Sequence, residues 1–273
     1  MNTINVNTIN LSDKIIKKVF DGGGGNSGGD NTDANIFAPF IDDGKTRLYI
    51  QILQNEEREI AINYEQESAN SLEIDWGDGS PVETSESTFK YLPHQYKDKG
   101  VYCITLSPLG NTTYSLGSTI TQSSIFGYDH RNTLGMNSII RADIGSQCVN
   151  IAYSFRSSLV RIVNFSPKIQ LESIGKYAFY LTVCPYFIIP KTVKTFQQSC
   201  FYATSASSLR VIDCSALDSV PTLIDTYALP SMGYNKNNLQ IVVPDNLYDE
   251  WIIKTNWSNF DSIIIKASEF NKN

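Results

Sequence analysis

The sequence predicts a mainly β protein, in which a β-sandwich precedes a short, irregular repeat solenoid closed by a helix and a strand. Two observations predict this class. In the first half of the chain, short stretches alternate apolar and polar residues, which is typical of half-buried strands. In the second half, apolar motifs recur with a period in the low twenties, which indicates coils that bury their apolar residues by stacking on one another.

Composition bounds the class of protein. The chain has 273 residues, enough for two modest domains, and 41% of them are hydrophobic, which fits a folded globular chain. The net charge of −6 and the absence of an evident basic stripe argue against a nucleic-acid partner. No apolar run approaches the length of a membrane span, so we expect no membrane insertion. Abundant Ser, Thr and Asn favour a protein that works outside cells.

The N-terminal part is predicted to connect the protein to something else. Residues 1–20 hold spaced apolar side chains and are expected to form an attachment segment, with a poorly ordered terminus as the alternative. Residues 21–35 are predicted to be a glycine-rich flexible linker. Residues 1–13 lack the apolar core of a signal peptide. We therefore expect either that a leader was removed or that the protein reaches the outside without one, as virion proteins do.

A glycine tract behind a short N-terminal segment resembles, in composition, the tether of tail-fibre and decoration proteins of Bacteroidales phages. The tract also holds one imperfect unit of a calcium-binding glycine repeat. Such repeats bind calcium only when stacked, so we expect no metal and no cofactor.

The first domain is predicted to occupy residues 36–117. Alternating patterns predict short strands near residues 47–52, 59–63, 71–76, 89–91 and 101–106. Several short strands at this spacing favour a β-sandwich. The last of them, 101–106, has apolar residues on both faces and is expected to be buried on both sides.

A turn motif organises this domain. Trp76 ends a strand and is expected to anchor one face of the sheet, with its indole N–H near a polar rim. The glycines of the turn tolerate positive φ, and its aspartates can bond to nearby backbone amides. A carboxylate pair or calcium site at the aspartates is the weaker alternative. The motif residues are Asp75, Trp76, Gly77, Asp78, Gly79, His94 and Tyr96.

The W-G-D-G-S turn, the H-x-Y and the following G-x-Y-x-I-T-L strand together resemble a PKD (polycystic kidney disease) domain. That resemblance implies an immunoglobulin-like β-sandwich that serves as an extracellular spacer or adhesion module, without catalysis of its own. In this family the histidine and tyrosine of H-x-Y are expected to pack and hydrogen-bond.

Residues 118–273 are predicted to form the repeat domain. Segments 174–179 and 196–201 match 22 residues apart, and segments 187–190 and 241–244 echo each other. The I-G-x-x-A-F unit, the following Cys184 and the I-I-P-K stretch resemble the BspA-type leucine-rich repeat of bacterial surface proteins. The resemblance implies a short solenoid of irregular coils.

The C-terminal end is predicted to cap the solenoid. Asp245 is the expected N-cap of a helix whose buried face would hold Leu247, Tyr248, Trp251 and Ile252. An apolar strand at 263–265 follows. The pattern resembles the closing cap found after BspA-type repeats, and a cap is needed because the last coil would otherwise expose its core.

Side chains that carry chemistry are few. The five cysteines are Cys103, Cys148, Cys184, Cys200 and Cys214, and we expect buried thiols, with one disulfide as the alternative. Apart from His94, His130 is the only histidine, and no nucleophile motif accompanies it, so we expect no enzyme. Exposed tyrosines on a solenoid face would suit glycan or protein recognition, although at least half could pack between coils. The candidates are Tyr177, Tyr180, Tyr186, Tyr202, Tyr227 and Tyr234.

These patterns favour a non-enzymatic adhesion protein of a phage virion, such as a head or tail fibre or a decoration protein. It would contact other virion proteins through its N-terminal segment and a bacterial surface glycan or protein through its repeats. A bacterial cell-surface adhesin of the BspA type is the alternative, and a glycan-active hydrolase is a third. A homo-oligomer would suit a fibre, although no heptads indicate a coiled coil.

Overall fold

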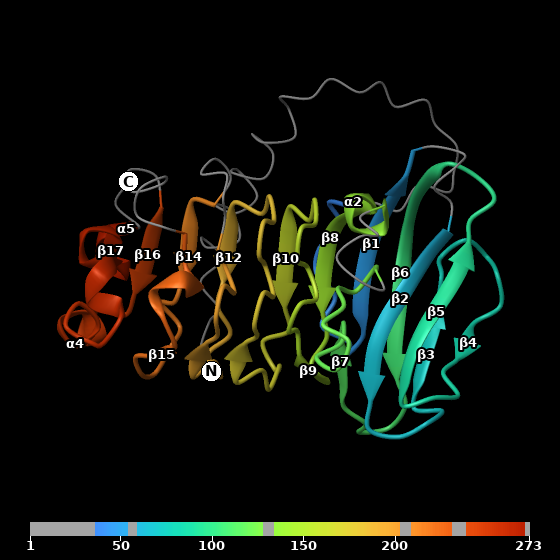
Figure 1. The fold of residues 1–273 in the computed structure, drawn as a ribbon, viewed down its shortest axis with the longest axis horizontal. Coiled ribbons are helices and arrows are strands. Elements are labelled where there is room, and N and C mark those ends of the chain that lie inside the picture. Colours follow the sequence, from blue (N-terminus) through green and yellow to red (C-terminus); the bar gives the residue numbers. More distant parts are fainter. Residues whose placement is uncertain (1–35, 54–58, 128–133, 203–208, 231–238, 271–273) are drawn as a thin grey trace.

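The computed structural model describes residues 36–53, 59–127, 134–202, 209–230 and 239–270. The protein is mainly β, as predicted. Strands from the first half of the chain gather at one end of the molecule, and later strands follow in sequence order toward the other end (Figure 1). The predicted attachment segment 1–20 and linker 21–35 lie outside the described residues.

Two sheets build the N-terminal end. The larger has the order β10-β8-β1-β6-β3-β4 and is antiparallel except for the β8–β10 pair. Its strands are β1 (Thr46–Ile52), β3 (Leu72–Asp75), β4 (Glu83–Thr84), β6 (Gly100–Pro108), β8 (Ile139–Ile144) and β10 (Ile162–Phe165). The smaller has the order β5-β2-β7-β9. It contains β2 (Glu59–Gln66), β5 (Phe89–Gln95), β7 (Tyr114–Leu116) and β9 (Cys148–Asn150).

Alternation decides which side chains of β1 enter the core. Leu48, Ile50 and Ile52 are buried against the rest of the domain, as the period-2 pattern predicts. Tyr49 points the other way and is also buried, because the guanidinium of Arg141 lies over its ring at 5.0 Å. The strand is therefore covered on part of both faces.

Both sheets continue past residue 117, where the second domain was predicted to begin. β8 pairs with β1, and β9 pairs with β7. A short helix, α2 (Leu134–Ser138), leads into β8. Most of the buried apolar side chains form one cluster that reaches from Leu48 to Ile264, and a smaller cluster holds Tyr186, Val211 and Val242. The larger cluster includes residues from both predicted domains.

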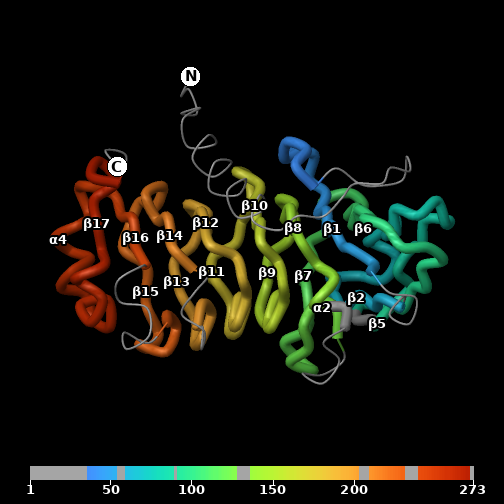
Figure 2. The backbone as a smooth tube through the Cα atoms, turned by 90° about the horizontal axis from the view of Figure 1, so that it is seen from above, coloured from blue at the N-terminus to red at the C-terminus, as the bar shows by residue number. Residues whose placement is uncertain are grey.

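Beyond β10, short parallel strands line up in two rows (Figures 1 and 2). One row contains β12 (Tyr186–Ile188), β14 (Val211–Asp213), β16 (Gln240–Val243) and β17 (Ile264–Lys266). The other contains β11 (Ser173–Ile174), β13 (Thr195–Phe196) and β15 (Thr222–Leu223). The register matches the sequence echoes: Ile174 pairs with Phe196, and Phe187 and Ile241 both pair with Ile212.

A row of stacked phenylalanines runs inside these layers. Phe179 lies between Phe155 and Phe201, with ring centroids 5.5 and 5.4 Å apart and nearly parallel planes. The backbone keeps the same register, because Phe155 N donates to Ala178 O and Phe179 N donates to Cys200 O, at 2.9 and 2.8 Å. All three rings are buried, so each layer buries its apolar residues against the next.

The C-terminal end differs from the predicted capped helix. The chain forms a 3-10 turn, η2 (Asp245–Leu247), and one helical turn, α4 (Tyr248–Trp251). The N-cap prediction for Asp245 is wrong, since no side chain caps either element and the Asp245 carboxylate accepts instead from Ser268 N at 3.0 Å. Pro244 occupies the N-cap position, and it has no side-chain oxygen that could accept from the first N–H groups of the turn. The other short elements are η1 (Thr226–Ala228), η3 (Trp257–Ile263) and α5 (Ala267–Phe270).

Of the predicted buried face, only Trp251 is fully buried, while Leu247, Tyr248 and Ile252 are partly buried. Trp257 is buried beside Trp251, with ring centroids 5.2 Å apart, and its indole N–H donates to Pro221 O at 2.8 Å. The end of the stack is therefore covered by the two tryptophans.

No helix in the described part of the chain is long and apolar enough to cross a membrane. All five cysteines are free thiols, so the alternative of a disulfide is wrong. Four of them are buried, and burial raises the pKa of Cys148 and Cys184 to about 12. Such thiols behave as small apolar side chains.

Candidate functional site

The turn motif is held by its own side chains. Asp75 Oδ1 accepts from Gly77 N at 2.9 Å, and Asp78 Oδ1 accepts from Ser80 N at 3.0 Å. Gly77 has φ of 75°, and a Cβ there would lie 2.5 Å from Cys103 O, so glycine is required where the turn passes β6. Gly79 has φ of 80°. Both carboxylates are thus engaged by the turn rather than arranged as a catalytic pair.

Trp76 is the centre of the motif. It is fully buried, its ring stacks on His94 with centroids 4.5 Å apart, and its indole N–H donates to Glu83 Oε1 at 2.8 Å. Tyr96 donates its hydroxyl to Trp76 O at 2.9 Å. His94 Nε2 lies 2.8 Å from Asp78 Oδ2. Trp76 and Tyr96 of the motif therefore pack the domain, while Asp75 is exposed at the turn.

The contacts of Asp78 lower the pKa of its carboxyl group. Burial by itself would raise the pKa, but hydrogen bonds from Ser80 and His94 outweigh it and lower the pKa to about 2. Asp43 has a pKa of about 2 as well, chiefly because Arg47 hydrogen-bonds to its carboxylate. Both groups are ionised throughout the ordinary working range of pH.

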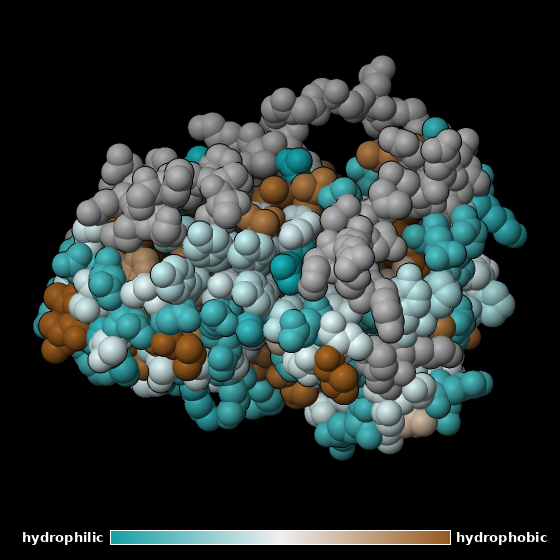
Figure 3. All heavy atoms as spheres, viewed as in Figure 1, coloured by the Kyte–Doolittle hydropathy of each residue, from teal (hydrophilic) through white to brown (hydrophobic). Residues whose placement is uncertain are grey.

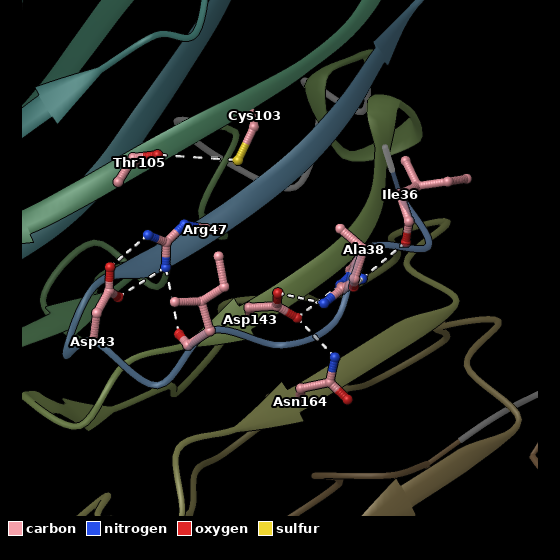
Figure 4. Close-up of polar contacts among 10 residues, drawn as sticks. Ile36, Ala38, Asp43, Arg47, Cys103, Thr105, Asp143 and Asn164 are labelled. Atoms are coloured by element: carbon pink, nitrogen blue, oxygen red, sulfur yellow. Dashed lines mark hydrogen bonds and ion pairs between the residues drawn. The ribbon is translucent and has the colours of Figure 1, made fainter. Parts of the chain in front are cut away.

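A second polar cluster fastens the chain segment that leads into β1 (Figure 4). Arg141, on β8, forms a two-pronged ion pair with Asp143, with N–O distances of 2.8 and 2.6 Å, and Asn164 donates to the same carboxylate at 2.7 Å. The remaining Arg141 nitrogen donates to Ile36 O and Ala38 O, at 2.9 and 2.5 Å. We call residues 36–45 the strap. Arg141 and Asp143 are almost fully buried beneath it.

The predicted tyrosines fall into layers of the parallel stack. Backbone bonds set the equivalences: Tyr153 N donates to Lys176 O, and Tyr177 N donates to Gln198 O, at 2.8 and 3.1 Å. Tyr180 and Tyr202 are one layer apart and stack with centroids 5.7 Å apart and planes within 10°. Tyr177 meets Tyr180 edge to face at 5.3 Å and Tyr153 at 5.5 Å.

Two cations complete this cluster, and the sequence analysis did not predict either. The guanidinium of Arg156 lies 5.0 Å from the ring centroid of Tyr177 and 5.5 Å from that of Tyr180. Lys176 Nζ lies 5.4 Å from the Tyr177 ring. We call the set Tyr153, Arg156, Lys176, Tyr177, Tyr180 and Tyr202 the tyrosine ridge. Tyr153 is buried, and the other members are partly exposed.

Of the three remaining candidate tyrosines, the structure describes Tyr186 and Tyr227. Tyr227 is 65% exposed and lies one layer beyond the ridge, since Ala228 O accepts from Phe201 N at 2.8 Å. Tyr186 is buried, with its hydroxyl donated to Asp213 at 2.8 Å, so this candidate was wrong. Tyr234 and His130 lie outside the described residues.

One face of the molecule, shown in Figure 3, is mostly polar. On this face, hydrophobic residues form small separate groups among hydrophilic ones (Figure 3). Among the described residues, no group of three or more His, Cys, Asp or Glu side chains could hold a metal ion. The tyrosine ridge brings together partly exposed tyrosines and two cations.

No protein-family model, curated protein or solved structure matches the chain.

Proposed function

We propose that the protein is a non-enzymatic structural and adhesion protein of a phage virion, a head or tail fibre or a decoration protein, that binds a bacterial surface. In this proposal residues 36–117 are an immunoglobulin-like sandwich of the PKD type, and residues 118–273 are a short leucine-rich-repeat solenoid of the BspA type. The in-register parallel pairs β11–β13 and β13–β15, whose partners are 22 and 27 residues apart, support the solenoid assignment.

The observation that carries the adhesion function is the tyrosine ridge. Repetition of the coil places an aromatic or cationic side chain at the same corner of successive layers, as Arg156, Tyr180 and Tyr202 do. Tyrosine combines a rigid apolar body with a polar tip, which suits recognition of hydroxylated or amphipathic ligands at low entropic cost.

The strap supports the tethered arrangement. Residues before Ile36 join the folded body through a segment that Arg141 binds from below, so the predicted linker would meet a firm attachment point. Free buried thiols also suit a protein that folds in a reducing compartment before release, as virion proteins do.

Immunogold labelling tests the virion assignment. An antibody against residues 36–273 is applied to lysate particles and to intact cells of the source culture. Label on phage particles is expected. Label confined to the cell envelope would overturn the virion assignment and favour the cell-surface adhesin.

A cell-binding assay tests the adhesion assignment. The purified chain, a Tyr180→Ala/Tyr202→Ala variant and an Ile253→Ala control are incubated with host cells. Ile253 is 77% exposed and lies outside the ridge. We expect the double variant alone to lose binding, and equal binding by all three proteins would place recognition elsewhere.

A further inference from the structure

Basic and acidic residues are unevenly distributed along the chain. Residues 144–212 hold seven basic residues and one acidic residue, Glu172, whereas the whole chain has a net charge of −6. This stretch therefore carries a charge of +6 and leaves −12 for the rest. Glu172 is itself paired with Lys194. The layers that build the tyrosine ridge are thus the basic part of an acidic protein.

The two cations of the ridge lie beside tyrosine rings, at 5.0 to 5.5 Å from the ring centroids. Neither Arg156 nor Lys176 forms an ion pair or a side-chain hydrogen bond with another described residue. Stacking on a ring leaves the N–H edges of a guanidinium open, and those edges match a carboxylate in a two-pronged hydrogen bond. The site is thus complementary to an anionic ligand.

The tyrosines indicate what else the ligand carries. The hydroxyls of Tyr177, Tyr180 and Tyr202 form no hydrogen bond with any described residue, and all three side chains are partly exposed. A phenol hydroxyl both donates and accepts, as does a sugar hydroxyl. The ridge therefore offers a repeated array of hydroxyls beside the cations of Arg156 and Lys176, which have no ion-pair partner among the described residues.

From this combination we infer that the tyrosine ridge binds an acidic polysaccharide, one whose sugar carboxylates pair with Arg156 and Lys176 while its hydroxyls bond to the tyrosines. The inference rests on the proposed adhesion function and names its ligand class. Single-stranded nucleic acid fits less well. Binding of that kind stacks bases on open aromatic faces, but Tyr180 is flanked by Arg156 on one side and Tyr202 on the other.

The test is direct binding of the full chain to three polymers, measured by biolayer interferometry: polygalacturonate, the same polymer with its carboxylates reduced to alcohols, and oligodeoxythymidylate. We expect binding to polygalacturonate that weakens as salt is raised, and little binding to the reduced polymer. Equal binding to the neutral polymer, no binding to polygalacturonate, or tighter binding to the oligonucleotide would overturn the inference.

Variants then locate the site. R156Q should weaken binding to polygalacturonate about tenfold or more, as expected when a charge-assisted hydrogen bond is lost. K191Q, which removes an exposed lysine of the same basic stretch outside the ridge, should bind within about twofold of the original chain, because a surface charge away from the site contributes little. A Tyr180→Phe/Tyr202→Phe variant keeps the stack and removes only hydroxyls, and should also bind more weakly. Equal losses in R156Q and K191Q would mean attraction by general charge alone and would overturn the site.

Unfolding midpoints of all variants provide the folding control. Failure of this inference is distinguishable from failure of the adhesion function. Cells that bind the chain through Tyr180 and Tyr202, while polygalacturonate does not bind, would retain the function and reject the ligand class.

Discussion

Asp78 joins the turn to the aromatic centre of the first domain. One carboxylate oxygen accepts from Ser80 N and the other contacts His94, which in turn stacks on Trp76. The distance along the chain from Asp78 to His94 is 16 residues, so the contact closes a loop as well as a turn. A substitution of Asp78 therefore removes contacts to the turn and to the aromatic centre at once.

Protonation of Asp78 is expected to destabilise the fold. Its folded pKa of about 2 lies below its ordinary value of 3.8, so the stabilisation is present above pH 3.8 and is lost as the pH falls toward 2. Urea unfolding at pH 7 and pH 3 should show a smaller loss of stability for Asp78→Asn than for the original chain. Asp249→Asn, at an exposed position, is the control. Identical pH dependence in all three proteins would contradict the assignment.

Arg141 and Asp143 form the buried counterpart of the more exposed Arg47–Asp43 pair, and both are drawn in Figure 4. Arg141→Met leaves a buried carboxylate without its cation and should lower the free energy of unfolding by about 3–5 kcal/mol. Arg47→Met should cost less than about 1 kcal/mol.

A double variant, Arg141→Met/Asp143→Leu, removes both charges and should be less destabilising than Arg141→Met alone, as measured by urea unfolding. If the single and double variants were equally unstable, the loss would come from the strap contacts and not from an unpaired charge.

The turn aspartates and the Arg141–Asp143 pair differ in how much of their environment the local sequence predicts. The turn aspartates follow from chemistry within five residues of sequence. Arg141 and Asp143 are two apart on one strand and therefore share a face, but their burial depends on the strap, whose contacts lie 103 and 105 residues away. No pattern in the local sequence therefore predicts that Arg141 and Asp143 are buried.

At the scale of elements, the layers depend on the phenylalanine row. Phe179 is packed between rings from the layers on either side, so Phe179→Ala should leave a cavity that both layers share and cost about 3–5 kcal/mol. Tyr227→Ala, at a 65% exposed ring, should change stability by less than about 0.5 kcal/mol. Chemical denaturation of the two variants measures both effects. A small loss for Phe179→Ala would show that the layers are not coupled through the row.

One sequence echo coincides with a strand pairing: segments 174–179 and 196–201 match in sequence, and Ile174 pairs with Phe196. Sequence reasoning did not predict that β8 and β9 would extend the sheets of the first domain. Those pairings join residues that are about 90 and 35 apart, and strand alternation says nothing about which partner a strand finds. Tyr177, Tyr180 and Tyr202 were among the candidates, but Tyr153, Arg156 and Lys176 were missed, because no basic stripe is evident in the sequence and only the stacking of the layers brings these side chains together.

At the scale of the molecule, one buried cluster runs from Leu48 to Ile264. A continuous core predicts a single cooperative transition. Calorimetry of the full chain should give equal calorimetric and van't Hoff enthalpies, and two separate transitions would contradict the shared core. A fragment ending at residue 117 should not fold, because it lacks β8 and so exposes one edge of β1.

The strap has a mechanical consequence. A pull on the chain before Ile36 reaches the two carbonyls held by Arg141 before it reaches β1. Once those bonds, the contacts of Asp42 with Ser166 and Lys168, and the Asp43–Arg47 pair yield, the ten residues of the strap can extend to a length of at most roughly 35 Å while the sheets remain intact. Under load, the chain would thus lengthen at the strap before any strand of the core is pulled from its sheet.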